Sequence, residues 1–152
     1  MSETSLHRRL IAKLDVVDGY PPADREGLWC VPDGIGTFVL DSIPFFVDGL
    51  ALGDVVSAED DENEELILEK VERSGGHSTV RVVFFGDYDI NEVQRLRNEI
   101  VGAGCESEFD LQRGIVAIDV PSRVELAPLE SMLNELEKCG RIEWWVGVLR
   151  HT

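Results

Sequence analysis

Four polar residues in the stretch from Ser74 to Arg81 are the candidates for chemistry in this sequence. Ser74, His77, Ser78 and Arg81 stand close together, and a serine beside a histidine can form an activated nucleophile. Sequence neighbours on a turn rarely align a hydroxyl with an imidazole, and no GxSxG motif surrounds these serines. The two glycines before His77 favour a turn, because glycine adopts positive φ without strain. We interpret the stretch as a turn first, as a ligand-binding site second and as a catalytic site last.

An acidic run between Glu59 and Glu65 is the second candidate site. Carboxylates suit hard cations, but the run lacks the spaced acids, central glycine and terminal glutamate of an EF-hand loop. We therefore predict no metal there. Residues 59–72 hold eight acids and one lysine, a net charge of −7. The run predicts a solvated hairpin tip, and its functional interpretation is a binding surface for a basic partner. The acids concerned are Glu59, Asp60, Asp61, Glu62, Glu64 and Glu65.

The composition limits the class of partner. The 152 residues carry a net charge of −16 and have a pI near 4.4. This charge repels nucleic-acid phosphates and anionic lipids and attracts basic proteins, although acidity also serves solubility. With 43% hydrophobic residues, the chain is long and apolar enough to form a globular core. We expect neither nucleic acid nor a membrane as partner.

The cysteines and the apolar segments indicate the compartment. Cys30, Cys105 and Cys139 are odd in number and widely spaced, which argues against a disulfide framework and a CxxC metal site. No apolar run approaches the ~20 residues needed to span a bilayer, and the start of the chain has no continuous apolar region. We predict a cytoplasmic protein with reduced, inert cysteines and without a cofactor.

The first half of the sequence has β-strand patterns separated by turn signals. The Asp18–Pro22 cluster marks a loop, because proline has no N–H to donate. Several short strands without a convincing helix predict a small antiparallel sheet or an SH3-like barrel in a β-rich subdomain, residues 1–74. The expected strands are residues 6–17, 28–31, 37–40, 53–58 and 65–72.

An irregular apolar segment, residues 43–52, interrupts these strands. Four large apolar side chains within eight residues would form an adhesive patch if they were left in water. We predict that they are largely buried and that the Phe46→Ala substitution lowers the free energy of unfolding by roughly 3–5 kcal/mol. The four are Phe45, Phe46, Leu50 and Leu52.

The second half repeats one pattern of strand, capped helix, glycine stop and strand. The repeat predicts a ferredoxin-like βαββαβ subdomain, residues 75–152, with both helices on one face of an antiparallel sheet. Trp144 and Trp145 should lie on opposite faces, one under the second helix and one between the two halves. The expected strands are 79–85, 105–109, 115–120 and 142–149. The apolar helix faces are Ile90, Val93, Leu96, Ile100 and Val101, and Leu126, Leu129, Met132, Leu133, Leu136 and Cys139.

Several short motifs resemble an uncharacterised bacterial family, a domain of unknown function. The matching stretches are Leu28-Trp29, Ile43–Phe46 (IPFF), Gly49–Val56 (GLALGDVV) and Ser74–Arg81 (SGGHSTVR), followed by Gly104-Cys105 with Glu108. The resemblance covers most residues from Leu28 to about Glu108 and implies a bacterial cytoplasmic protein without an established activity. The family pattern has one glycine before the histidine, and this sequence has two.

Three hypotheses follow from these observations. The first is a non-enzymatic interaction protein that binds and neutralises a basic partner, such as a toxin enzyme, as immunity and inhibitor proteins do. The second is a regulatory domain in which the 74–81 stretch and the ferredoxin-like sheet form a pocket for a small ligand. The third, a hydrolase using Ser78 or His77, ranks last, so we predict no enzymatic activity.

Overall fold

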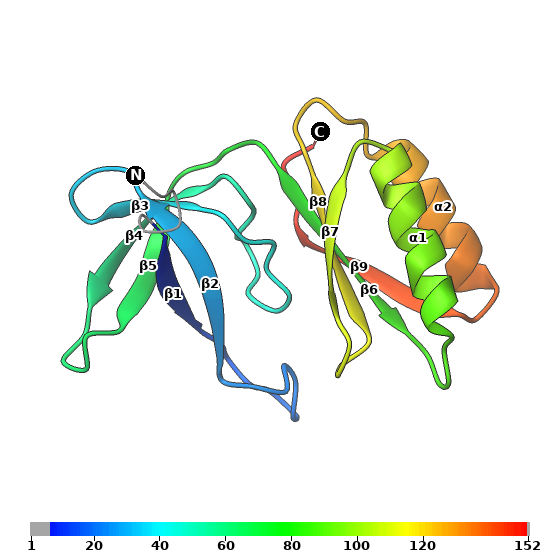
Figure 1. The fold of residues 1–152 in the computed structure, drawn as a ribbon, viewed down its shortest axis with the longest axis horizontal. Coiled ribbons are helices and arrows are strands. Elements are labelled where there is room, and N and C mark those ends of the chain that lie inside the picture. Colours follow the sequence, from blue (N-terminus) through cyan, green and yellow to red (C-terminus); the bar gives the residue numbers. More distant parts are fainter. Residues whose placement is uncertain (1–6, 152) are drawn as a thin grey trace.

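The first five strands of the chain form a closed β-barrel (Figure 1). The computed structural model describes residues 7–151, so Leu6, the expected first residue of the first strand, lies outside the described part. Consecutive strands pair antiparallel, and a parallel pairing of β1 with β5 closes the barrel. The barrel strands are β1 (Arg8–Lys13), β2 (Arg25–Pro32), β3 (Thr37–Leu40), β4 (Val55–Asp60) and β5 (Leu66–Arg73).

Alternation along the strands places one row of apolar side chains inside the barrel. In β2, Leu28 and Cys30 are buried while Trp29 between them is exposed, as the period of two requires. The strands expected at 28–31, 37–40 and 65–72 are confirmed, and β4 runs two residues further than expected, into Glu59 and Asp60. The barrel core consists of Leu10, Ala12, Leu28, Cys30, Phe38, Leu40, Leu50, Val56, Ala58 and Leu66.

The second half forms a four-stranded sheet in the order β7-β8-β6-β9, in which each neighbouring pair is antiparallel. Both helices cover the same face of this sheet (Figure 1). The predicted order of strands and helices and the antiparallel pairing of β7 with β8 are therefore confirmed, and the chain is of the α+β class. The elements are β6 (Ser78–Phe84), α1 (Ile90–Gly102), β7 (Glu106–Asp110), β8 (Ile115–Val120), α2 (Ala127–Lys138) and β9 (Ile142–Val148).

The helices bury narrower faces than their sequences suggested. Asp89 caps α1 by accepting a hydrogen bond from the Asn91 N–H at 2.9 Å, which supports the start of this helix. Ile90 and Val101 are 54% and 67% exposed, so their predicted place on the buried face is wrong. Cys139 is exposed as well. Ile90 begins α1 and Cys139 follows the end of α2, whereas Val101 lies one position after the buried Ile100 and so about 100° further around the helix.

The two tryptophans of β9 lie on opposite faces of the sheet, as predicted. Trp144 packs against the core beneath the helices and donates its Nε1–H to Asn134 at 3.1 Å. Trp145 pairs in register with Arg81 on the opposite face and is partly buried. Within residues 7–151, no helix is long and apolar enough to cross a membrane.

The irregular segment 43–52 is less buried than predicted. Leu50 is 1% exposed, whereas Phe45, Phe46 and Leu52 are only half-buried. The segment lies between the barrel and the second sheet, where rings at its edge remain accessible to water. The Phe46 ring meets Tyr20 edge-on, at 6.1 Å between ring centroids. The prediction of a largely buried cluster is therefore confirmed for Leu50 and holds in part for the other three side chains, which are neither fully buried nor exposed.

Candidate functional site

Arg81 of β6 reaches across the junction between the two halves and binds the 43–52 segment. Its side chain is buried, and its guanidinium donates to the carbonyls of Pro44 (3.2 Å), Phe46 (3.3 Å) and Val47. The same group contacts the Asp48 carboxylate at 2.8 Å. All these acceptors belong to the chain itself. Arg81, which the sequence marked for ligand contact, therefore holds a loop of the other half in place.

Glu26 of the barrel binds the same segment from the opposite side. Its carboxylate accepts backbone N–H groups from Phe45 (2.7 Å), Phe46 (3.1 Å) and Val47 (2.9 Å). An irregular loop needs partners for such groups, because a buried N–H without an acceptor costs about 1–3 kcal/mol. Glu26 of the barrel and Arg81 of the sheet thus supply hydrogen bonds to the backbone of the 43–52 segment that a neighbouring strand would otherwise have made.

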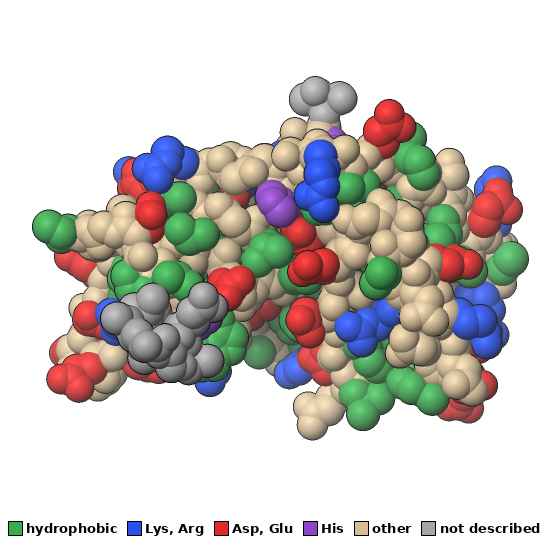
Figure 2. All heavy atoms as spheres, turned by 45° about the horizontal axis from the view of Figure 1, so that its top comes forward, with side chains coloured by type: hydrophobic (Ala, Val, Ile, Leu, Met, Phe, Trp, Pro, Cys, Tyr) green, Lys and Arg blue, Asp and Glu red, His purple; other side chains and the backbone are tan. Residues whose placement is uncertain are grey.

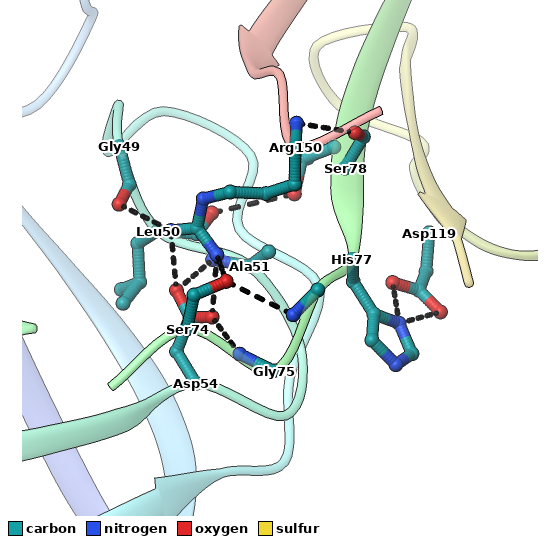
Figure 3. A network of polar contacts seen from close by, with 12 residues as sticks. Gly49, Leu50, Ala51, Asp54, Ser74, Gly75, His77, Ser78, Asp119 and Arg150 are labelled. Carbon is teal, nitrogen blue, oxygen red and sulfur yellow. Dashed lines mark hydrogen bonds and ion pairs between the residues drawn. The ribbon is translucent and has the colours of Figure 1, made fainter. Parts of the chain in front are cut away.

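Asp54 and Arg150 form the second link across the junction (Figure 3). The Asp54 side chain is fully buried and accepts both guanidinium N–H groups of Arg150, at 2.8 and 3.0 Å. It also accepts the N–H of Ala51 and of Gly75, each at 3.0 Å. The hydrogen bonds from Arg150 to Asp54 raise the pKa of the arginine. Arg150 also donates a hydrogen bond to the Ser74 hydroxyl, so this hydroxyl already has a partner within the chain.

Ser78 holds the C-terminal segment rather than facing solvent. Its side-chain oxygen lies 2.6 Å from His151 Nδ1 and accepts the Arg150 N–H at 2.8 Å. His151 Nε2 lies 2.9 Å from the Pro121 carbonyl. Since that carbonyl can only accept, Nε2 carries the proton and Nδ1 accepts the Ser78 hydroxyl proton. Ser78 has 0% exposure, so its hydroxyl is closed to solvent, whereas His151 is half-buried and lines the groove described below.

His77 is the residue of the 74–81 stretch whose side chain has a ring nitrogen without a hydrogen-bond partner in the described part of the chain. Its Nδ1 donates to both Asp119 oxygens, at 2.7 and 3.0 Å, and the aspartate is buried. Burial raises the pKa of Asp119, and the hydrogen bond from His77 opposes that rise. Figure 3 shows the second ring nitrogen pointing away from Asp119. No hydrogen-bond partner for this Nε2 is present among residues 7–151, so it is available to a ligand.

Two glycines set the path of the linker between the halves. A Cβ on Gly75 would lie 2.6 Å from the Gly53 carbonyl oxygen, which no side chain tolerates. Gly76 has φ +85° and lies against Ser122. This position favours glycine, because residues with a Cβ rarely adopt a positive φ. Residues 74–77 belong to no strand or helix, and Ser78 to Arg81 already lie in β6, so the predicted turn is limited to a short linker that leads into a strand. The additional glycine of this sequence fits a close approach of the two backbones.

A groove of about 770 Å³ lies beside this linker. The loop before α2 forms one wall, with Arg123 and Leu126, and the C-terminal part of the chain forms the other, with Val146 and Leu149. A volume of this size lies in the range of small-molecule sites, about 300–1,000 Å³. The groove combines apolar walls with a few charged groups at its rim.

The acidic run forms the exposed turn between β4 and β5, at the end of the barrel furthest from the helices (Figure 1). Asp60 pairs with Arg8 at 2.8 Å, and Glu65 pairs with Arg25 at 3.0 Å. Asp61 shapes the turn by accepting the N–H groups of Asn63 and Glu65, each at 2.9 Å. Three of the six acids therefore have a counter-charge or a structural task.

The remaining acids of the run, Glu59, Glu62 and Glu64, are exposed. Their carboxylates have no ion pair or hydrogen bond with any residue from 7 to 151. On the face shown in Figure 2, acidic side chains are spread over both halves of the molecule. The three glutamates thus add local negative charge to an acidic surface without stabilising the turn. We call them the hairpin glutamates.

No metal centre is evident in the part of the chain that the structure describes, where no cluster of three or more His, Cys, Asp or Glu side chains has suitable geometry. All three cysteines, which lie within that part, are free thiols. Burial raises the pKa of the Cys30 thiol to about 11. A raised pKa disfavours the thiolate, which is the reactive form, so Cys30 is poorly suited to nucleophilic chemistry.

The sequence did not identify several residues of the junction. Asp119 had a signal, because an acid inside the apolar strand IVAIDV is unusual for a buried position. Asp54 stood within the GLALGDVV motif without an assigned role. Glu26, Arg150 and His151 had no local signal, since their partners are distant in sequence: 96 residues separate Arg150 from Asp54. The motifs of the family pattern largely build this junction.

Comparisons with known proteins identify the family of the chain and support its fold. A search of curated proteins gives no match. A solved structure described as "Novel crystal structure of a hypothetical protein from Neisseria gonorrhoeae" is similar, with a TM-score of 0.77 and 19% identity, over 93% of this chain and 94% of that one. At this identity the likeness concerns the fold alone. A family model, "Domain of unknown function (DUF4265)", matches residues 26–144. The chain therefore belongs to the DUF4265 family, a domain of unknown function.

Proposed function

We propose that this chain is a non-enzymatic interaction protein whose acidic hairpin binds a basic protein partner. The observation that carries the proposal is the state of Glu59, Glu62 and Glu64, which are exposed and have no counter-charge within residues 7–151. A toxin enzyme neutralised by an immunity or inhibitor protein is the type of partner that fits. The binding surface includes the whole acidic run, with Asp60, Asp61 and Glu65 beside the hairpin glutamates.

The junction supports a binding protein over an enzyme. Ser78 and Arg81 are buried, and their polar atoms are engaged by the chain. A nucleophile must reach its substrate, and Ser78 does not. The charge that remains accessible is predominantly acidic, which steers cationic proteins and repels nucleic acids and anionic membranes. We accordingly propose a cytoplasmic protein with neither nucleic acid nor a membrane as partner.

Electrostatics favour a partner at the hairpin for a second reason. Like charges close together on one turn repel each other and oppose folding, and interspersed charges would serve solubility equally well. A cationic partner would relieve this repulsion on binding. The attraction should also accelerate association at low salt, because screening acts over about 10 Å at 0.1 M ionic strength.

Affinity capture with matched variants tests the proposal. The immobilised chain is exposed to a lysate of its source organism, and retained proteins are quantified by mass spectrometry. A hairpin variant carries Glu59→Gln, Glu62→Gln and Glu64→Gln. A control variant carries Glu99→Gln, Glu125→Gln and Glu143→Gln, which change the net charge equally at exposed positions of the other half.

We expect the unmodified chain and the control variant to retain the same basic protein and the hairpin variant to lose most of it. Equal retention by the hairpin variant would contradict the proposal, because the local charge would then be irrelevant. Equal loss by both variants would show that net charge, and not the hairpin, governs binding. Circular dichroism and melting temperatures confirm that all three proteins are folded.

A small-ligand-binding regulatory domain is the second candidate function, favoured by the groove that Gly76 of the linker lines and by the Nε2 of the neighbouring His77, which has no hydrogen-bond partner within residues 7–151. The linker, which is held by Ser74, His77, Ser78 and Arg81, would then shape the ligand site, and His77 would contact the ligand directly. A screen of metabolites by thermal shift tests this candidate. A compound that raises the melting temperature of the unmodified chain, but not of the His77→Gln and Arg123→Gln variants, would support it. No stabilising compound, or one indifferent to both substitutions, would contradict it.

The finer architecture is part of the proposal. We propose an SH3-like barrel in a subdomain of residues 1–74 and a ferredoxin-like arrangement in residues 75–152. The five short strands of the closed barrel and the order β7-β8-β6-β9 with two helices on one face support these descriptions. Limited proteolysis within the linker, followed by isolation of the two pieces, tests whether each one folds alone.

A further inference from the structure

The outer surface of the barrel carries an apolar face formed by neighbouring strands. Alternation points Leu28 and Cys30 of β2 inward and Trp29 outward. By the same alternation, one valine of β3 and one of β4 point outward between buried neighbours. We call this surface the Trp29 face. It consists of Trp29, Val31, Val39 and Val55.

Strand pairing makes the Trp29 face continuous. Val31 lies directly opposite Val39 in the β2–β3 pair, and Val39 lies opposite Val55 in the β3–β4 pair. Directly paired residues on one face are about 4.5–5.5 Å apart at Cβ, so their side chains are in contact. Trp29 is two residues before Val31 on the same strand face. At the turn that joins β2 to β3, Ile35 is 105% exposed.

Trp29 remains 53% exposed at the edge of this surface, next to Arg9 of β1. Trp144, in contrast, packs on the core of the other half and has a hydrogen bond for its indole N–H. A half-exposed tryptophan within a continuous group of β-branched side chains is a feature of interaction surfaces, where aromatic residues often dominate the binding energy.

The Trp29 face leads along β4 to the acidic hairpin. Val55, Ser57 and Glu59 alternate with the buried Val56 and Ala58 and so share the outer surface. Four residues of strand span about 13 Å, well within a standard interface of about 800 Å² on each partner. Arg9, the residue paired with Trp29, places its guanidinium over Gly27. The apolar face and the uncompensated acids are therefore parts of one surface.

We propose that the Trp29 face is the apolar centre of the partner-binding surface and that the hairpin glutamates form its acidic rim. This inference rests on the proposed function and adds the location of the contact and the chemistry of the partner. An apolar centre beside an acidic rim matches a basic protein that presents an apolar patch bordered by lysine or arginine. Burial of the indole then supplies affinity, and the acids supply orientation and speed of encounter.

Site-specific photo-cross-linking in cells of the source organism tests this inference. The full chain carries the photoreactive amino acid p-benzoylphenylalanine in place of Trp29 or, in a second version, of Val31. A control version carries it in place of Leu111, which is 67% exposed on the other half. Each version is also made with the three glutamine substitutions in the hairpin. Cross-linked products are identified by mass spectrometry, and melting curves establish that each version is folded.

We expect cross-links from positions 29 and 31 to one basic protein, several-fold above the yield from position 111, and a several-fold loss of that product in the hairpin variant. Cross-links no stronger than at position 111, or to an acidic protein or to a second copy of this chain, would overturn the inference. Capture that depends on the hairpin glutamates without any cross-link from positions 29 and 31 would overturn the inference alone. A strong cross-link to a basic protein that ignores the hairpin substitutions would instead contradict the proposed function.

Discussion

Asp54 and Arg81 at the junction are buried, Arg150 is half-buried, and each binds partners from the other half of the chain. Within residues 7–151, no buried side-chain nitrogen or oxygen lacks a hydrogen bond. In the hairpin, Glu59 and Glu62 are exposed and have neither an ion pair nor a structural task. The comparison separates charge that maintains the fold from charge that is available for binding.

This difference changes what substitution at each place should do. A buried charge has lost its hydration, so removal of its partner leaves an uncompensated group and destabilises strongly. An exposed charge loses little when it is neutralised, and surface substitutions usually change stability by about 0.5 kcal/mol or less. The following measurements test or sharpen the contrast.

Arg81→Ala should give the largest loss of stability, about 3–5 kcal/mol. It removes the donors that satisfy the Pro44 and Phe46 carbonyls, and each buried acceptor left unpaired costs about 1–3 kcal/mol. Urea denaturation of the variant and of Arg95→Ala, an exposed arginine of α1, measures the difference. A loss for Arg81→Ala as small as that for Arg95→Ala would contradict the claim that the buried charge of the junction maintains the fold.

Arg150→Met should be the next most destabilising, by about 2–3 kcal/mol, because it leaves the buried Asp54 carboxylate without its counter-charge. Water can reach this end of the pair, since the Arg150 side chain is 17% exposed, and this limits the loss. The double variant with Asp54→Asn isolates the coupling. If the effects of the two single substitutions simply add, the pair does not link the halves.

Phe46→Ala should cost about 2 kcal/mol, less than the sequence suggested. The ring is half-buried and keeps contacts with Tyr20 and with the Arg113 guanidinium, 5.6 Å from its centroid. Partial burial scales down the transfer and cavity terms of a core phenylalanine. Chemical denaturation beside Phe85→Ala, a 49% exposed ring, provides the reference. A loss near 5 kcal/mol would agree instead with the larger effect that the sequence suggested.

Cys30 allows a smaller, pH-dependent test of a buried titratable group. Folding raises the pKa of this thiol from 9.0 to about 11 by burial, so the folded chain holds the proton more tightly than the unfolded chain. Its contribution to stability is complete below pH 9 and is lost as the pH rises. Relative to Cys30→Val, the unmodified chain should lose roughly 1 kcal/mol between about pH 9 and 10.

Denaturation curves at several pH values measure this loss, and subtraction of the two proteins removes the titration of other groups. Cys139→Val serves as control, because Cys139 is exposed in the folded chain. A difference between Cys30→Val and the unmodified chain that stays constant with pH would show that the thiol does not lose solvent on folding.

Local patterns in the sequence predicted the helices and strands. The features that the sequence did not predict depend on contacts between residues that are distant in sequence. Alternation identified the strands, and Asp89 with a period near 3.6 identified α1. Sequence periodicity does not show how wide the covered face of a helix is, so exposure at Ile90 and Val101 was missed. The irregular segment had no period at all, and its burial depends on Glu26 and on distant arginines.

The candidate site could be predicted only in part for the same reason. The sequence presented the 59–65 run as uniform, whereas the structure gives Asp60 and Glu65 arginine partners from β1 and β2. It also presented Ser78 and Arg81 as accessible polar residues, and both are buried. Pairing between strands distant in sequence decides which charges are free, and one sequence contains little information about it.

The most direct test of the central claim is the rate at which the captured basic partner associates with this chain as salt rises. From about 20 mM to about 200 mM salt, the rate should fall steeply for the unmodified chain and for the variant with glutamine at 99, 125 and 143, because screening weakens the attraction. The variant with glutamine at 59, 62 and 64 should associate more slowly and depend less on salt. An identical rate and an identical salt dependence in the hairpin variant would contradict the claim and leave the acidic run as a solvated turn.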